Sequence, residues 1–445
     1  MLAQELIEFM KNFFYLFFFA LLAFGLSQFL MRQNEKDLQD KTITNLTLWN
    51  VPPKSLPLDR QIWDETVSEF ETQNPNIKVE GVEREYQPEE FITVMAGGKG
   101  PDLVKVWVGA IQTLANLGFL DPVDTYIQNW SQKGFIKPVL FESTKVGDHF
   151  YGIPADTYFL FLLYRKDLFT AAGLNPETPP ATWDELANTA KILTHREKGQ
   201  YGLGLVPKTW YFQDFVWQAG GEMTRTENDK VHAAFFEPQA VQALRFWKDL
   251  CWKYRVLQPD VLMPENEILH LFALGKIAMT FGTENQLPAL ITRYKIAPQS
   301  FGIAPLPAGP AGKAAHLGGD VYVINATTSE EKKNAAWKWI EFELSPANQL
   351  HKWVRMHELK MFVYPGAFSS ATNIANQDEF KMVKDALETA RVEPHVNGWP
   401  QVRDLLDEAP LQNIFLDPDA DPQQLLLSYA KEADRDIFAK VKAVP

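Results

Sequence analysis

The sequence is poor in several features on which common functional classes depend. It has a single cysteine, Cys251, among 445 residues, so it contains no disulfide framework. Acidic residues outnumber basic ones, 56 to 43, and the net charge of −13 argues against a nucleic-acid partner, because phosphate binding requires clustered lysine and arginine. No HExxH motif occurs, and the spacing of His351 and His357 does not suit a metal site. We therefore expect neither a metal nor a cofactor.

A long apolar run, FFYLFFFALLAFGLSQFLM, occupies residues 13–31. It is long enough to span a bilayer and apolar on all sides, which is not typical of a core helix. The small residues Ala23 and Gly25, which flank Phe24, suit cleavage of a signal peptide. Two interpretations stay open for residues 1–31, a cleaved signal peptide or an uncleaved membrane anchor. Both place the rest of the chain outside the cytoplasm, after a charged tether over residues 32–42.

The remaining chain alternates short apolar runs with amphipathic stretches. It exceeds the length that one hydrophobic core serves, so two lobes are expected. Strands are predicted at 46–49, 77–79 and 103–107, with helices at 59–74 and 88–96. This order is typical of a mainly parallel sheet with helices on both faces, in which ligands bind beyond the carboxyl ends of the strands. Trp49 and Trp107 fall at two such ends.

One strand stands out in the middle of the chain. Residues 158–164, YFLFLLY, form an almost unbroken apolar run that follows Gly152 and Pro154 and stops at Arg165. Its length and aromatic content favour a buried strand over a helix. Two interpretations stay open, a core strand of an α/β sheet or a crossover strand between two lobes. In the second, Asp156 lies at the mouth of the strand, where a carboxylate meets a ligand.

The segment after this strand repeats the alternation. Thr182 and Glu185 form a capping box that begins one helix, and Thr328 and Glu331 form a second before a tryptophan-rich helix at 335–344. Other helices are predicted at 238–255 and 265–274, and strands at 201–205, 277–281, 301–304 and 321–325.

The stretch TWYFQDFVW at 209–217 is unusually aromatic, with five rings. One face of a helix is too narrow to bury so many neighbouring rings. We therefore expect some of them to point into a cleft.

Five sequence blocks occur in an order and spacing that resemble one family of proteins. They are 100–104 (GPDLV) with 118–122 (GFLDP), 151–154 (YGIP) with 164–169 (YRKDLF), 182–186 (TWDEL), 272–279 (FALGKIAM) and 302–307 (GIAPLP). Through them, nearly everything after residue 42 is similar to the family 1 extracellular solute-binding proteins of bacterial ABC importers, the group that includes maltose-binding protein.

The resemblance implies an α/β fold with two lobes, the periplasmic-binding-protein or Venus flytrap fold. Each lobe is then a mainly parallel sheet flanked by helices, and the chain crosses between lobes near 153–157, 310–317 and 358–366. Lobe I would comprise residues 43–155 and 317–360, and lobe II residues 156–316 and 361–445.

The resemblance also implies a function and partners. The chain would be a non-catalytic, monomeric binding protein, periplasmic or otherwise extracytoplasmic, with its N-terminus as a candidate anchor to the inner membrane. It would bind a small carbohydrate between the lobes and deliver it to the transmembrane subunits of an ABC permease. Its contact with the membrane would run through the apolar N-terminus or the permease.

A sugar site requires carboxylates and amides for the hydroxyl groups and flat rings for the apolar C–H face. Matched to the family pattern, the residues at or beside ligand-facing positions are Trp49, Trp107, Asp156, Tyr158, Trp210, Tyr211, Trp217, Glu284, Gly319, Asp320 and Trp399. For each aromatic residue a place in the core is the alternative. Asp320 is the strongest candidate, because an acid between a glycine and a buried strand needs a partner. For Glu284 the alternative is an acid at a helix N-terminus.

Two departures from the family pattern narrow the expectation. The lipid-anchor cysteine after the signal is absent, and VGA at 108–110 replaces a charged pair of the maltose binder. The second favours a disaccharide or a glycosyl-polyol such as glucosylglycerol over a long maltodextrin. Two other functions stay open: a secreted carbohydrate-active enzyme that uses two cleft carboxylates as acid and base, and a glycerol-phosphate or peptide binder on the same fold.

Overall fold

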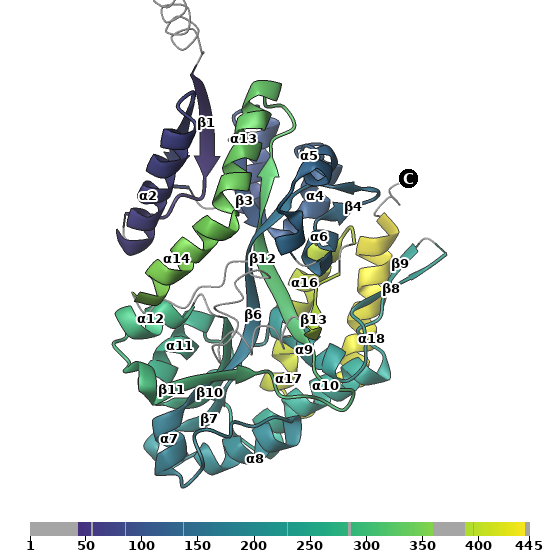
Figure 1. Cartoon of the computed structure of the whole chain (residues 1–445). Helices are drawn as coiled ribbons and strands as arrows, with labels where there is room; N and C mark the ends of the chain where they lie inside the picture. The colour runs from purple at the N-terminus through teal and green to yellow at the C-terminus, as the bar shows by residue number, and fades with distance from the viewer. Residues whose placement is uncertain are drawn as a thin grey trace, which may run out of the picture.

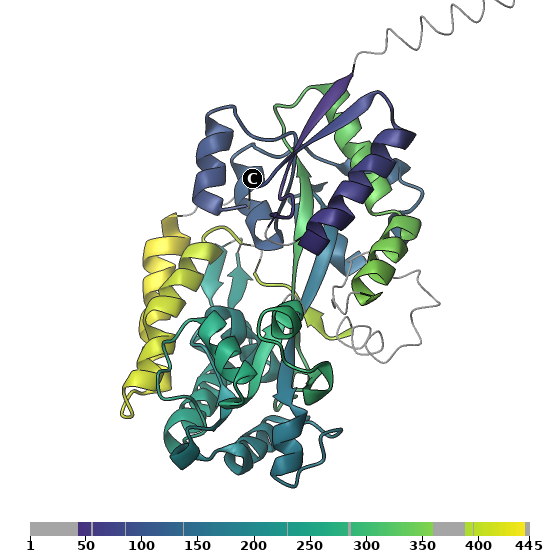
Figure 2. The same ribbon diagram turned by 90° about the vertical axis from the view of Figure 1, so that its left-hand side faces the viewer.

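The computed structural model describes residues 43–54, 57–84, 86–136, 138–228, 230–283, 286–358, 388–394 and 396–440. Two α/β bodies lie one above the other in Figure 1, joined by two long strands, and Figure 2 shows the same division after a quarter turn. The predicted two-lobed α/β fold is confirmed. The expected signal or anchor at 1–31, the tether at 32–42 and nearly all of the expected crossing at 358–366 lie outside the described residues.

The upper body is built on three parallel strands in the order β2-β1-β3. Its elements from the first part of the chain are β1 (Thr44–Trp49), α2 (Pro57–Gln73), β2 (Ile77–Val82), α3 (Pro88–Ala96), β3 (Leu103–Trp107), α4 (Ile111–Asn116), α5 (Asp124–Asn129), α6 (Pro138–Glu142), β4 (Lys145–Val146) and β5 (His149–Phe150). The chain returns to it with α13 (Glu330–Glu343) and α14 (Pro346–Glu358). Pro88 at the first turn and Gly97 after the last explain the bounds of α3, which match the prediction.

The lower body centres on the parallel pair of β7 and β10. Its elements are α7 (Lys166–Ala171), α8 (Trp183–Leu193), β7 (Tyr201–Gly204), α9 (Thr209–Gln218), β8 (Thr224–Glu227), β9 (Lys230–Ala233), α10 (Pro238–Lys248), α11 (Glu265–Ala273), β10 (Ile277–Thr283), α12 (Leu287–Thr292) and β11 (Phe301–Pro305). The C-terminal helices α16 (Trp399–Glu408), α17 (Pro410–Leu416) and α18 (Pro422–Glu432) pack beside it, yellow in Figures 1 and 2.

Strands β6 (Ile153–Arg165) and β12 (Ala315–Ile324) join the two bodies. The first part of β6 pairs with β12, which in turn pairs with β3 of the upper body. From Leu160 onward, β6 pairs instead with β10 and β11 of the lower body. The central apolar run of the sequence is therefore a strand shared by both bodies, while the exact lobe boundaries stay predictions.

The buried apolar side chains follow the same division. A large cluster in the lower body runs from Leu160 to Phe438, and two clusters fill the upper body around Phe70 and Phe91. Separate cores are what a two-lobed chain of this length requires. Within the described residues, no helix combines the length and apolar character needed to cross a bilayer.

Two local predictions were wrong, and a third stays a prediction. Ser329, not Thr328, caps α13, because the Thr328 hydroxyl donates to Asp102 at 2.9 Å while Ser329 accepts from the Lys332 amide. Strand β12 begins at Ala315, earlier than the predicted 321–325. The prediction that some rings of α9 point into a cleft stays open for Trp210 alone, because the other four rings are at most 5% exposed. Contacts with α10, β12 and α16 cover this helix on several sides.

Candidate functional site

The polar centre of the molecule lies where β6 and β12 cross between the bodies. In the strand register, Asp320 on β12 stands beside Trp107 at the end of β3 and beside Asp156 on β6. Farther along β6, Leu160 pairs with Thr283 at the end of β10. The carboxyl ends of β3 and β10 are thus separated by four residues of β6, or about 13 Å. Strand ends of both bodies converge on one junction, the arrangement in which α/β sheets bind ligands.

A charged group occupies the upper side of this junction. Lys105 donates a hydrogen bond to Asp156, and its ammonium lies 5.2 Å from the centre of the Tyr322 ring. Desolvation opposes both charges, but their mutual attraction outweighs it. The pKa of Lys105 is therefore raised well above its ordinary value, and the pKa of Asp156 is lowered. The ion pair stays charged at neutral pH.

Asp320 differs from Asp156 in its surroundings. Burial, reinforced by the negative charge of Asp156, raises the pKa of Asp320 to about 6. The register of β6 and β12 shifts between Asp320 and Val321, a β-bulge that changes the strand direction locally. Asp320 thus carries a carboxylate at neutral pH that burial disfavours, and hydroxyl donors from a ligand would stabilise it.

An aromatic group occupies the lower side of the junction. The rings of Trp210 and His316 lie 3.7 Å apart between centroids, and Tyr158 packs on Trp210 at 6.0 Å. Trp217 lies 6.0 Å from His316, and the Arg391 guanidinium covers the Trp217 ring at 5.0 Å. The central rings come from helix α9 of the lower body and from strand β12, which joins the two bodies.

Beneath these rings lie polar atoms that lack partners. The Gln213 amide donates to Nδ1 of His316, which leaves Nε2 of His316 as the N–H donor. Within the described part of the chain, that nitrogen, Oε1 of Gln213 and both carboxylate oxygens of Asp214 have no hydrogen bond of ordinary geometry. Burial, with a smaller contribution from the charge of Arg403, lowers the pKa of His316 to about 3, and burial raises that of Asp214 well above its usual range. His316 is therefore uncharged at neutral pH, and burial favours the uncharged form of Asp214.

The structure brings together only part of the predicted site. The residues that meet at the junction are Trp107, Asp156, Tyr158, Trp210, Gly319 and Asp320, and Trp217, itself only 5% exposed, adjoins it through the His316 ring. Glu284 lies outside the described residues.

Three predicted aromatic residues lie in packed surroundings instead. Trp49 is 5% exposed, packs on Phe91 and is covered by Arg84 at 4.4 Å. Tyr211 donates to Glu265 and lines a cavity of about 10 Å³, which has room for no more than a water molecule. Trp399 is 2% exposed. These three fit the alternative of a place in the core.

Sequence reasoning missed three junction residues, Lys105, Gln213 and His316, and the buried acid Glu393 beside Gly109. A lysine within the apolar strand LVKVW was a visible signal, because a buried lysine needs an acidic partner. Glu393 accepts from Nε1 of Trp399 at 3.0 Å and faces Gly109 so closely that a β-carbon there would lie 2.1 Å from its Oε1. Nothing in the local sequence marked Glu393. Among the described residues, no cluster of histidine, cysteine and acidic side chains is suited to hold a metal ion.

Comparison with known proteins agrees with this architecture. The family model described as bacterial extracellular solute-binding protein matches residues 55–350. A putative binding protein of Brucella abortus is 27% identical over 84% of this chain and 89% of its own length. The sn-glycerol-3-phosphate-binding periplasmic protein of Shigella flexneri is 23% identical, with 82% and 86% covered. The solved structure of an ABC transporter solute-binding protein from Thermotoga lettingae, bound with alpha-D-tagatose, superposes with a TM-score of 0.75 at 27% identity, covering 88% of this chain and 99% of the other.

Proposed function

The chain belongs to the bacterial extracellular solute-binding protein family, and we propose that it is the substrate-binding component of an ABC importer for a neutral sugar or polyol. The ligand is a mono- or disaccharide, or a glycosyl-polyol such as glucosylglycerol. It binds at the junction of β6 and β12 and is handed to the transmembrane subunits of a permease. The tagatose complex of the Thermotoga lettingae protein supports a ligand of this class.

One observation carries the proposal: two carboxylates lie side by side at the junction, with aromatic rings next to them. Asp320 lies between Trp107 and Asp156, and the Trp210 ring lies below them beside β12. Carboxylates accept strong hydrogen bonds from hydroxyl groups, and indole rings cover the apolar face of a sugar ring. Since Trp210 packs on His316 in this conformation, the ligand enters when the bodies move apart and closes them by contacting both.

The charges of the junction favour a neutral ligand over a phosphate ester. A phosphate site requires an arginine or a helix N-terminus free to face the anion. Arg391 already forms two hydrogen bonds with Glu222 at 2.7 and 2.8 Å, and Arg403 pairs with Glu393 at 3.5 Å. Asp156 and Asp320 repel an anion as well. We therefore do not extend the similarity with the sn-glycerol-3-phosphate-binding protein of Shigella flexneri to the ligand of this chain.

An enzymatic alternative has one supporting observation. Asp156 and Asp320 are neighbouring carboxylates whose pKa values move in opposite directions, as in an acid–base pair. A glycosidase, however, needs the ionised member free to attack or to activate water. Asp156 is held by Lys105, so we favour binding without chemistry.

The remaining parts of the proposal concern the cellular location and the oligomeric state of the protein. The protein acts outside the cytoplasm, as the family implies, and works as a monomer. Its apolar residues 13–31 either direct export or hold the protein at the inner membrane beside the permease.

A thermal-shift screen of the full chain tests this function. Neutral sugars, glycosyl-glycerols, polyols, sugar phosphates and amino acids are compared, and each ligand is recovered afterwards and analysed. A neutral glycoside or sugar at about 100 times its dissociation constant should add about 2.7 kcal/mol to the free energy of unfolding and be recovered intact. Cleavage of the ligand would establish the enzyme, and a shift with sugar phosphates alone would establish the phosphate binder.

A further inference from the structure

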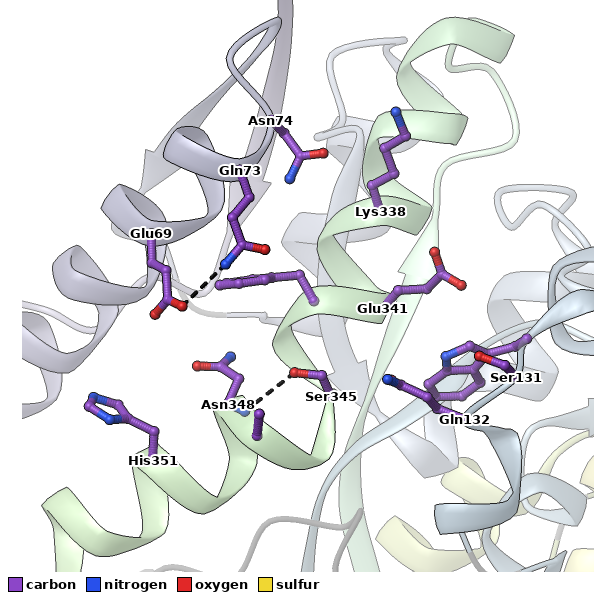
Figure 3. Close-up of a pocket in the computed structure, with 13 residues that line it drawn as sticks. Glu69, Gln73, Asn74, Ser131, Gln132, Lys338, Glu341, Ser345, Asn348 and His351 are labelled. Carbon is purple, nitrogen blue, oxygen red and sulfur yellow. Dashed lines mark hydrogen bonds between the residues drawn. The ribbon is translucent and has the colours of Figure 1, made fainter.

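A second cavity lies in the upper body, apart from the junction. Its volume is about 570 Å³, and its walls come from the end of α2, the loop after α5 and the corner between α13 and α14 (Figure 3). A cavity of this size holds a small molecule. None of its lining residues belongs to the junction described above.

Two polar atoms in the wall have no hydrogen-bond partner among the residues that the structure describes. They are Nε1 of Trp130, a side chain only 2% exposed, which has no acceptor, and the buried Oε1 of Gln132, which has no donor. Neighbouring polar groups are satisfied: Gln73 donates to Glu69 at 3.2 Å, and Asn348 donates to the Glu343 carbonyl at 3.1 Å. The residues that carry this unpaired donor and acceptor both line the cavity, so a small movement of each side chain would let a group bound there bond to it.

Hydroxyl groups meet this requirement, because each oxygen accepts one hydrogen bond and donates another. The charges of the cavity also disfavour an anion, since Glu69 and Glu341 outnumber Lys338, which Figure 3 places on the α13 wall. Phe342 and the indole of Trp130 add apolar faces to the wall. We propose that this cavity is a second binding site, for a neutral polyhydroxylated molecule of the size of a sugar or polyol, held through Trp130 and Gln132.

This site does not depend on the proposed function of the junction. Trp130 belongs to the upper core and packs against Trp337, whereas Trp210 and Trp217 report on the junction. Trp247 offers a matched control: its Nε1 is equally buried and unpaired, but it lies in the core of the lower body and does not line the cavity.

Indole N–H signals of the full chain, labelled with ¹⁵N-tryptophan and kept in detergent, test the site. Glucose, sorbitol and sucrose serve as probes, and the signals are assigned with the single variants Trp130→Phe, Trp210→Phe, Trp217→Phe and Trp247→Phe. We expect at least one probe to shift the Trp130 signal in a saturable way, with the Trp247 signal unmoved. Trp130→Phe and Gln132→Ala should each weaken that binding about fivefold, because each removes one hydrogen bond; for the first variant, affinity is followed by calorimetry.

The outcomes separate the two sites. A saturable shift of the Trp130 signal without any change at Trp210 and Trp217 would support binding in this cavity and would contradict binding of the same sugar at the junction. Shifts at Trp210 and Trp217 alone would overturn the inference and leave the proposed function standing. A Trp130 shift that only grows in proportion to concentration, or that Gln132→Ala leaves unchanged, would show that water fills the cavity and would also overturn it.

Discussion

Asp156 and Asp320 stand directly opposite each other on the antiparallel strands β6 and β12, immediately before the register of the pair shifts. Lys105 neutralises one of these carboxylates and leaves the other to face burial. This asymmetry gives the junction one structural carboxylate and one that gains from a ligand. It also has measurable consequences in the free protein.

Replacing Asp320 by asparagine should stabilise the ligand-free protein at pH 7.5. The pKa of Asp320 is raised to about 6, so ionising this carboxyl group in the folded protein lowers the free energy of unfolding. The loss of stability begins as pH rises above the ordinary pKa of 3.8 and is complete above pH 6. We expect a gain of about 1–3 kcal/mol in the free energy of unfolding at pH 7.5 and almost none at pH 4, measured by urea titration. Asp419→Asn, at an exposed acid, is the control; an equal gain at both pH values would refute the assignment.

Replacing Lys105 by methionine should have the opposite effect on stability. The variant leaves Asp156 without its partner, and the side chains of this pair are 20% and 34% exposed, so we expect a loss of about 1–3 kcal/mol at pH 7. The pKa of Asp156 is lowered, so the contribution of the pair is present above pH 3.8 and lost as pH falls below it. The double variant Lys105→Met/Asp156→Leu should be less destabilised than the single one. A double variant as unstable as Lys105→Met alone would show that the unpaired Asp156 carboxylate does not cause the loss of stability.

The two tryptophans at the ends of β1 and β3 should respond differently to alanine substitution. Trp107 is 43% exposed and lies beside Asp320, so Trp107→Ala should weaken sugar binding about tenfold and change the free energy of unfolding by less than about 1 kcal/mol. Trp49 is 5% exposed, so Trp49→Ala should cost about 3–5 kcal/mol of stability. Calorimetry and urea unfolding measure both. The reverse pattern would place Trp49 in the site and Trp107 outside it.

His316 should make the protein sensitive to mild acid. Its pKa is lowered to about 3, below the ordinary value of 6.5. Between these two pH values the unfolded chain binds a proton at this histidine and the folded protein does not. Stability is therefore lost as pH falls from 6.5 toward 3. Relative to His316→Asn, the wild type should lose about 2 kcal/mol between pH 7 and pH 5, while His351→Asn, at an exposed histidine, serves as control. A His316 ring that titrates near pH 6.5 by NMR would contradict this account.

Local signals predicted much of the fold. The proline and glycine that bound α3 and the capping box at Thr182, whose hydroxyl accepts from the Glu185 amide at 3.2 Å, act within one turn of the chain and need no partner elsewhere. The long strand β6 was also visible, because its apolar run is continuous.

Other features depend on contacts that no local pattern contains. Strand β12 includes Gly318 and Gly319, which interrupt a strand pattern in sequence. In the fold Gly318 makes room for the Tyr158 ring, which a β-carbon there would approach to 2.1 Å. Four of the five rings of α9 are buried because other elements cover the helix.

The candidate site shows the same limit. Carboxylates and rings were predicted as residue types, but the row formed by Trp107, Asp320 and Asp156 arises from strand register across distant segments. The partners that tune it, Lys105 and His316, became evident only when those strands were placed side by side.

A crystal structure of the full chain with the sugar or polyol that the thermal-shift screen selects tests the central claim most directly. We expect one intact ligand between the bodies, with hydroxyl groups within hydrogen-bond distance of Asp320 and a ring face on Trp107 or Trp210. A junction that stays empty while the same ligand binds elsewhere, or a ligand found cleaved between Asp156 and Asp320, would contradict the account.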